Sequence, residues 1–113
     1  MNRGDVYDAR LDPVEGSEQK GSRPAVIVSR NAINTSSPIV VVVPCTTYRA
    51  GRRLYPSHVL LKSPDGGLTA DSVALAEQIR VMDKGRLLRC RGTLSAAAME
   101  QLTQALVVTL DLA

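Results

Sequence analysis

The sequence contains no tryptophan and no phenylalanine, and its aromatic residues are three tyrosines, Tyr7, Tyr48 and Tyr55. A hydrophobic core therefore has to be built from aliphatic side chains, chiefly valine, leucine, isoleucine and alanine. Hydrophobic residues make up 44% of the chain and charged residues 22%, a composition that is ordinary for a globular protein and argues against disorder. The length of 113 residues predicts a single domain, residues 1–113.

Long hydrophobic runs and cysteine pairs are also missing. No segment approaches the roughly 20 apolar residues that cross a bilayer, and the first residues do not resemble a signal peptide. The sequence therefore predicts a cytoplasmic protein with no membrane partner. Its two cysteines, Cys45 and Cys90, are far apart and fit neither a zinc site nor a disulfide framework, so we expect both to be reduced and mostly packed.

Most catalytic signatures are absent as well. The one histidine, His58, lies inside a predicted strand, so no histidine pair is available for acid and base catalysis. The sequence has no HExxH motif, no Cys/His ligand spacing, no phosphate-binding GxxxxGK[ST] loop and no GxGxxG fingerprint. These absences argue against metal-dependent hydrolysis and nucleoside-triphosphate chemistry, and they predict no metal and no cofactor.

Positive charge is present in moderate excess and is clustered. The formal net charge is +3 and the isoelectric point is near 9.2. This balance suits a polyanionic partner without requiring one, because solvated basic faces are common in cytoplasmic proteins. Two clusters stand out: Arg49, Arg52 and Arg53 in one, and Lys84, Arg86, Arg89 and Arg91 in the other.

The hydrophobic pattern predicts a mainly β fold. Residues 4–11 alternate as a half-buried strand does, and the β-branched runs at 24–29 and 38–44 are bounded by prolines and predict central strands. Further strands are expected at 57–62 and 88–94, with a short helical turn at 83–87. Residues 71–82 fit either a helix or two short strands meeting at a bend, and the β-branched residues favour the strands.

The C-terminal residues predict a helix lying on a small, barrel-like sheet. Ser95 is placed as its N-cap, since the hydroxyl can accept a hydrogen bond from a free backbone N–H. Glu100, Gln101 and Gln104 fall on the opposite, solvent-facing side. An apolar stripe at helical spacing predicts the buried face, formed by Met99, Leu102, Ala105, Leu106 and Leu110.

Three polar residues lie at the ends of the predicted buried strands, where their side chains could meet an anion. Arg23 stands before Pro24, which favours an extended backbone and holds the guanidinium at the mouth of the sheet. Thr46 and Thr47 emerge where the second apolar run ends. A guanidinium and a strand-end hydroxyl can converge on one anion. The alternative is purely structural: Arg23 pairs with Glu18, and the threonines satisfy a loop backbone.

Five blocks, in this order and separation, resemble the MazF/PemK family of toxin endoribonucleases over essentially the whole chain. They are RGDVY at 3–7, LDPxxGSEQ at 11–19, RPAVIVS from 23, the apolar strand closing on PCTT, and DSVALAEQIRVMDKGRL at 71–87. The resemblance implies a compact, SH3-like β-barrel with short helices and a C-terminal α-helix. It further implies a homodimer that cuts single-stranded RNA at short sequence motifs without a metal.

The resemblance also implies roles for residues. The arginine and the threonine that are the family's catalytic candidates correspond to Arg23 and Thr46. The reaction that the resemblance implies is attack of a ribose 2′-OH on the adjacent phosphate, which gives a 2′,3′-cyclic phosphate and a free 5′-OH. Proton transfer stays open between Glu18, as the base, and Arg23, which acts electrostatically or as an acid. The loop and the E-Q-I-R block are implied to border the RNA, while basic and aromatic residues after the strand supply further contacts. The expected RNA-binding residues are Ser17, Gln19, Lys20, Thr47, Tyr48, Arg49, Arg53, Glu77, Gln78 and Arg80.

The expected partners are single-stranded RNA and a cognate antitoxin whose acidic, partly disordered segment covers the basic groove. Two other functions remain open on the sequence alone. One is a toxin of the same fold that poisons a protein target such as a gyrase. The other is a non-catalytic RNA-binding module. The combination of Arg23 and Thr46 favours the nuclease.

Overall fold

The computed structural model describes residues 1–112 of the chain. Within them the chain forms seven strands, two α-helices and three single 3-10 turns. The helices are α1 (Asn31–Ser36) and α2 (Ala96–Leu110), and the turns are η1 (Asp65–Gly67), η2 (Ala76–Gln78) and η3 (Lys84–Arg86). The strands are β1 (Asp5–Arg10), β2 (Ser22–Ile27), β3 (Ile39–Thr47), β4 (His58–Leu61), β5 (Ser72–Leu75), β6 (Arg80–Asp83) and β7 (Leu87–Thr93).

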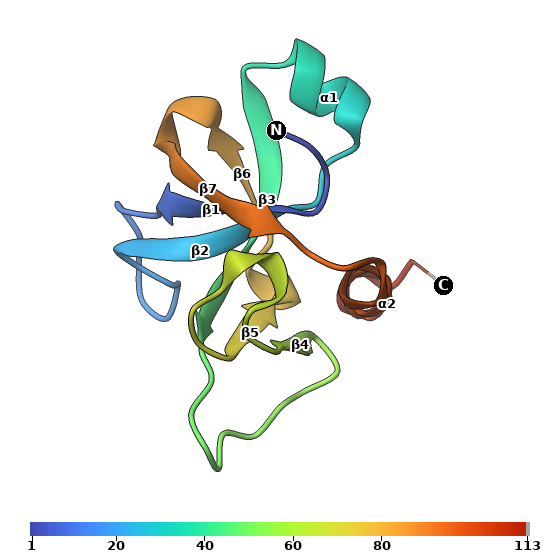
Figure 1. Ribbon diagram of the computed structural model, residues 1–113. Coiled ribbons are helices and arrows are strands. Elements are labelled where there is room, and N and C mark those ends of the chain that lie inside the picture. Colours follow the sequence, from blue (N-terminus) through green and yellow to red (C-terminus); the bar gives the residue numbers. More distant parts are fainter. Residues whose placement is uncertain (113) are drawn as a thin grey trace.

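The strands form one strongly bent antiparallel sheet that closes on itself around β3. Pairing runs β7–β1–β2–β3–β6, and the two end strands of this series, β6 and β7, are joined by the short turn η3. The far end of β3 pairs instead with β5, which pairs with β4. In Figure 1 β3 runs between these two parts, with β4 and β5 below and α2 beside them. The expected mainly β, barrel-like fold with a C-terminal helix is confirmed.

Aliphatic side chains fill the interior in two clusters. One lies inside the five-strand part and contains Leu11, Ile27, Val40 and Met82. The other lies between the sheet and α2, where Leu102 packs with residues of β2, β3, β4 and β5. Because each strand alternates its side chains between the two faces, β3 supplies residues to both clusters. The aliphatic core predicted from the composition is therefore present.

The helix α2 begins as the sequence predicts. Ser95 Oγ accepts a hydrogen bond from the Ala98 N–H at 3.2 Å, and Asp65 accepts from both the Ser95 N–H and its hydroxyl at 2.8 Å. Leu102 and Ala105 face the core, but Leu110 is 47% exposed. The prediction that Leu110 belongs to the buried stripe is wrong, because the contacts of α2 with the core end at Leu106.

Two other features differ from the sequence-based expectations. The helix α1 was not predicted. Both thiols are free, but only Cys45 is packed: burial raises its pKa to about 12, whereas Cys90 is exposed on β7. The prediction of strands in residues 71–82 is confirmed, since β5 and β6 flank the turn η2.

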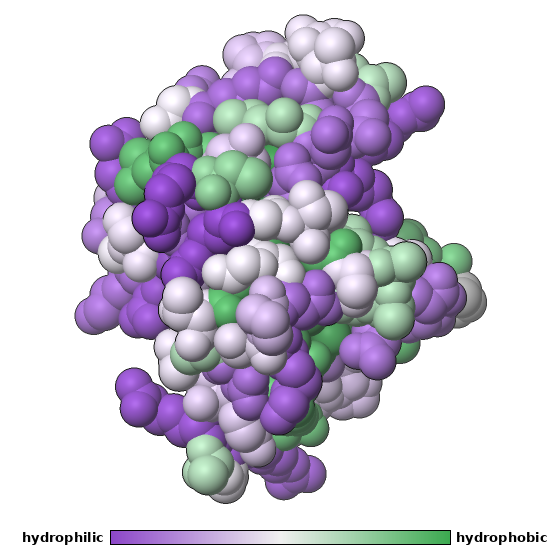
Figure 2. Space-filling view, viewed as in Figure 1, coloured by the Kyte–Doolittle hydropathy of each residue, from purple (hydrophilic) through white to green (hydrophobic). Residues whose placement is uncertain are grey.

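The surface in Figure 2 is largely hydrophilic on the side of the β1–β2 connection, and apolar patches appear beside α2. Within residues 1–112, none of the helices combines the length and the hydropathy that a membrane span requires.

Candidate active site

The strands β2 and β3 separate where the sequence places its two strand-end residues. Ala25 lies opposite Pro44 in the antiparallel register, and Arg23 and Thr46 each lie two residues beyond this last pair. Pairing between the two strands ends at Pro44, which has no N–H to donate. Beyond it, β3 turns to β5, and Thr46 pairs with Val73. Pairing between β2 and β3 therefore ends just before Thr46 on β3 and just after Arg23 on β2.

The guanidinium of Arg23 lies against the β1–β2 loop. Its Nε donates to the Lys20 carbonyl oxygen at 3.2 Å, and its two terminal nitrogens have no hydrogen-bond partner in the described chain. The structural alternative, an Arg23–Glu18 ion pair, does not form among residues 1–112. Instead, a Glu18 carboxylate oxygen accepts the Glu15 N–H at 2.7 Å. Arg23 thus keeps a two-pronged donor available for an anion.

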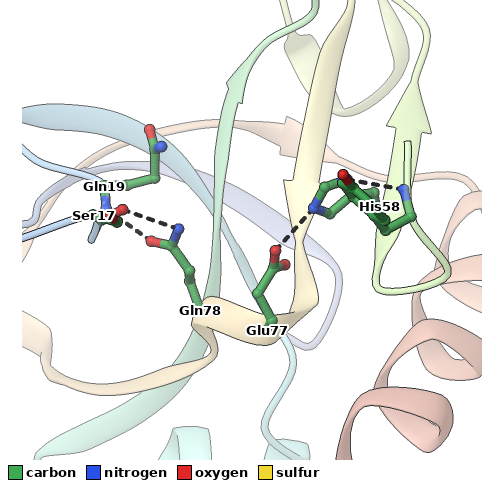
Figure 3. Close-up of polar contacts among 6 residues, drawn as sticks. Ser17, Gln19, His58, Glu77 and Gln78 are labelled. Atoms are coloured by element: carbon green, nitrogen blue, oxygen red, sulfur yellow. Dashed lines mark hydrogen bonds and ion pairs between the residues drawn. The ribbon is translucent and has the colours of Figure 1, made fainter. Parts of the chain in front are cut away.

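Gln78 ties the β1–β2 loop to the turn η2. Its side-chain oxygen accepts the Gln19 N–H at 2.7 Å, and its amide nitrogen donates to the Ser17 carbonyl oxygen at 3.5 Å. Figure 3 shows that Gln78 points toward the loop while its neighbour Glu77 points the other way, toward His58. Residues about 60 positions apart in sequence are thereby held together.

A cavity of about 190 Å³ lies between this loop and η2. Arg80 is half-buried at its wall, and its Nη1 donates to the Leu11 carbonyl oxygen at 3.0 Å. Five of the residues that line this cavity are expected at an RNA groove: Glu18, Gln19, Glu77, Gln78 and Arg80. Leu11, Pro44 and Ile79 complete its lining. The structure therefore brings together two segments, the GSEQ loop and the EQIR block, that the sequence places far apart.

The other expected contacts lie outside this cavity. Ser17 and Lys20 are exposed on the loop. Thr47 is the last residue of β3, and Tyr48, Arg49 and Arg53 lie in the β3–β4 connection that follows it. The expected site is thus divided between a loop side and a β3 side.

The β3 side is anchored by Asp71. The Tyr48 N–H donates to the Asp71 carbonyl oxygen at 2.8 Å, while the Asp71 carboxylate accepts from Lys62 Nζ and from the Ser63 N–H, each at 2.9 Å. The hydrogen bond from Lys62, followed by that from Ser63, lowers the pKa of the Asp71 carboxyl group. The same pair raises the pKa of Lys62. The backbone that carries Tyr48 is therefore fixed to β5.

One contact at this site is not indicated by any pattern in the sequence. His58 Nε2 lies 2.8 Å from Glu77 Oε2, although the residues belong to different elements. Only the pairing of β4 with β5, which sets His58 opposite Leu75, brings η2 within reach. No linear motif encodes that proximity. Within the described chain there is also no group of three or more His, Cys, Asp or Glu side chains placed to hold a metal ion.

Comparison with known proteins agrees over nearly the full length. Residues 2–110 match the sequence model of the PemK-like, MazF-like toxins of type II toxin–antitoxin systems. The chain is 43% identical to endoribonuclease MazF9 of Mycobacterium tuberculosis, covering 99% of this chain and 98% of that protein. It is also 43% identical to endoribonuclease MazF of Staphylococcus saprophyticus, with coverage of 99% and 92%.

Solved structures share the fold. A mycobacterial endoribonuclease in complex with its cognate antitoxin superimposes with a TM-score of 0.82 at 32% identity, covering 100% of this chain and 97% of that one. MazF from Deinococcus radiodurans gives a TM-score of 0.83 at 26% identity, with coverage of 98% and 96%. The chain therefore belongs to the PemK/MazF family of type II toxin–antitoxin toxins.

Proposed function

We propose that this protein is a toxin endoribonuclease that cleaves single-stranded RNA, including mRNA, at short sequence motifs, and that the opening between β2 and β3 is its active site. The observation that carries the proposal is the end of β2–β3 pairing at Ala25 and Pro44, which leaves Arg23 and Thr46 two residues beyond the last pair on their strands. Family membership and two endoribonucleases at 43% identity support the reaction class.

The chemistry that suits these residues uses a nucleophile from the RNA itself. The ribose 2′ oxygen forms a bond to the adjacent phosphorus, and the bond from phosphorus to the 5′ oxygen of the next nucleotide breaks. The 2′-OH loses a proton and the leaving oxygen gains one, so a 2′,3′-cyclic phosphate and a free 5′-OH result without any co-reactant. The protein has to supply charge for the phosphorane oxygens and a route for the protons.

In this proposal Arg23 supplies the charge. Its terminal nitrogens form a planar fork that matches two phosphate oxygens, and an arginine stays protonated throughout the reaction. Thr46 donates one more hydrogen bond to the same phosphate. Glu18, on the loop against which Arg23 lies, accepts the 2′ proton. Arg23 stabilises the charge on the leaving 5′ oxygen, which takes its proton from solvent water.

Contacts outside the reacting phosphate select the sequence. On the loop side, Ser17, Gln19 and Lys20 face the RNA with Glu77, Gln78 and Arg80. On the β3 side, Thr47, Tyr48, Arg49 and Arg53 guide the strand away from the opening. The mixture of carboxylates, amides and cations gives both donors and acceptors for base edges.

The proposed partners follow from the same surface. A cognate antitoxin would lay an acidic segment across the arginine-bearing opening and exclude RNA, as a relative of this chain has been solved in complex with its cognate antitoxin. We also propose a homodimer that acts in the cytoplasm, where the RNA substrate is found.

The reaction is tested by incubating the purified protein with a long single-stranded RNA in EDTA and mapping both ends of each fragment. We expect discrete cuts at a short motif, bearing 2′,3′-cyclic phosphate and 5′-OH ends. Cleavage that requires added metal, or fragments with 5′-phosphate ends, would contradict the proposed chemistry.

The site is tested by Arg23→Ala beside the matched control Arg30→Ala, which removes the same charge from beyond the other end of β2. We expect Arg23→Ala to lower kcat by about a hundredfold or more, because it removes the main donor to the phosphate, and to leave RNA affinity within a few-fold. Arg30→Ala is expected to cut normally. Equal activity of the two variants would contradict the assignment.

A further inference from the structure

His58 links the two sides of the candidate site. Its side chain is 5% exposed and accepts the Tyr55 N–H through Nδ1 at 3.2 Å. Because Nδ1 is an acceptor, the proton of the neutral ring is on Nε2. Nε2–H therefore donates to Glu77 Oε2 at 2.8 Å. The geometry selects one tautomer and uses both ring nitrogens.

The Glu77 carboxylate is held on one side only. Its side chain is 43% exposed, one oxygen is bound to His58, and Glu77 lines the cavity that Glu18 and Gln19 also line. On the same turn, Gln78 is fixed to the loop in the opposite direction (Figure 3). The turn η2 is thus fixed from both sides, and the second Glu77 oxygen has no hydrogen-bond partner within residues 1–112.

The β3–β4 connection is the second element that depends on His58. The His58 N–H donates to the Tyr55 carbonyl oxygen at 2.8 Å, and the two rings meet edge to face with centroids 5.4 Å apart. The Arg53 guanidinium carbon lies 5.2 Å from the centre of the Tyr55 ring. The orientation of one buried imidazole thereby supports an exposed tyrosine, an exposed arginine and a carboxylate.

We propose that His58 is a positioning residue for RNA recognition: Nε2–H presents the Glu77 carboxylate to the RNA, while the bond from the Tyr55 N–H to Nδ1 fixes the ring and its tautomer. This inference rests on the proposed endoribonuclease function. A carboxylate only accepts hydrogen bonds, so the free Glu77 oxygen binds a donor of the RNA. His58 does not touch the reacting phosphate, and its loss weakens substrate binding more than the chemical step.

Two substitutions separate the two ring nitrogens. The amide nitrogen of glutamine can replace Nε2–H, so His58→Gln retains the bond to Glu77 and loses the bond to Tyr55. The shorter asparagine can replace the Nδ1 acceptor, so His58→Asn retains the Tyr55 contact and leaves Glu77 unheld. Glu100→Gln is the matched control, because Glu100 lines a neighbouring groove of about 580 Å³ together with His58 but forms no hydrogen bond to it within residues 1–112.

The measurement is kcat and KM on an oligoribonucleotide that carries the motif mapped for the wild-type protein. Loss of a charge-assisted hydrogen bond predicts a KM about tenfold higher for His58→Asn, with kcat within about twofold. His58→Gln is expected to recover most of the KM at that motif, and Glu100→Gln to match wild type. If KM is unchanged in both His58 variants, or if Asn rescues and Gln does not, the inference is wrong.

A purely structural role for His58 predicts something different. It would lower the Tm of both variants and leave the KM of the folded fraction unchanged. If the variants do not fold, a long-range ¹H–¹⁵N spectrum of the wild-type protein identifies which ring nitrogen of His58 carries the proton. Protonation at Nε2 supports the inference, and a proton on Nδ1 of the neutral ring overturns it.

Failure of the inference and failure of the proposed function are distinguishable in the same experiment. A wild-type protein that cuts no RNA contradicts the proposed function, and the inference with it. A wild-type protein that cuts RNA while both His58 variants keep its KM contradicts the inference alone.

Discussion

The tether between Gln78 and the β1–β2 loop gives a prediction whose size can be worked out. In Gln78→Ala the half-buried hydrogen bond from the Gln19 N–H, at 2.7 Å, is lost, and so is the weaker contact to Ser17 at 3.5 Å. The first bond contributes about 1 kcal/mol and the second little, because it lies at the distance limit of a hydrogen bond. Opening of the loop should therefore become about fivefold more frequent.

Trypsin reports this opening at Lys20, which is exposed on the same loop. Because cleavage tracks the open population when opening is fast, we expect the rate of cutting after Lys20 to rise about fivefold in Gln78→Ala. The Tm should fall by no more than about 5 °C, since only a local contact is lost. Gln78→Glu keeps the acceptor oxygen for Gln19 and should behave as wild type, as should the exposed helical control Gln101→Ala. Equal cleavage of Gln78→Ala and wild type would refute the tether.

Three further predictions concern chemistry and packing. Thr46→Ala should lower kcat by about a hundredfold, because one donor to the phosphate is lost, while Thr46→Ser keeps most of the rate; wild-type turnover in Thr46→Ala would exclude a catalytic role. A thiol reagent at pH 8 should label Cys90 quickly and Cys45 only on unfolding, and equal labelling of both would contradict the burial of Cys45. The free energy of unfolding should also fall as pH rises above 9. The reason is that the pKa of the Cys45 thiol is 9.0 in the unfolded chain but about 12 in the folded protein. Gly67→Ala should prevent folding or lower the Tm severely, since an added Cβ would lie 1.9 Å from a backbone oxygen, whereas Gly21→Ala, at a similar positive φ but with nothing within 4 Å, should cost only about 1 kcal/mol.

Much of the fold was predictable because the strands carry strong local signals. Proline-bounded runs of β-branched residues gave β2 and β3, and alternation gave β1. The bend between β5 and β6 followed from β-branched residues on either side of an Ala-Glu-Gln turn. These signals act over a few residues, so a single sequence contains them.

The helix α1 shows why other parts were missed. Apart from Ala32, the residues of Asn31–Ser36 are weak or middling helix formers, and no side chain caps the start of the helix. It is held by buried Asn34, which donates to the Ser29 carbonyl oxygen at 2.9 Å and accepts from the Ser29 hydroxyl, while that hydroxyl also accepts the Val41 N–H. The network depends on β3 lying beside the helix, which no local pattern records.

The exposure of individual side chains was predicted less well than the helices and strands that carry them. Helical spacing correctly indicated the face that contains Leu102 and Ala105, but it did not indicate that contact with the core ends at Leu106, so Leu110 was misplaced. Cys90 was misplaced for a related reason. It lies on β7, which pairs with β1 through an irregular register and leaves most of its side chains outside the core.

The candidate site shows the same division. The positions of Arg23 near the start of β2 and of Thr46 near the end of β3 were predictable because both strands carry strong local signals. The tether by Gln78 and the contact between His58 and Glu77 were not predictable, since each joins elements whose proximity is set by the whole sheet. Pairings of that kind come from topology.

The central claim is that the RNA provides the nucleophile and the protein provides the charge, with Arg23 at the scissile phosphate. It is tested most directly with an oligoribonucleotide carrying a single 2′-deoxy nucleotide immediately 5′ of the mapped cut. The account predicts that this oligonucleotide binds with an affinity close to that of the unmodified RNA and is not cut at that bond. Cleavage of the modified bond at the unmodified rate would contradict the account.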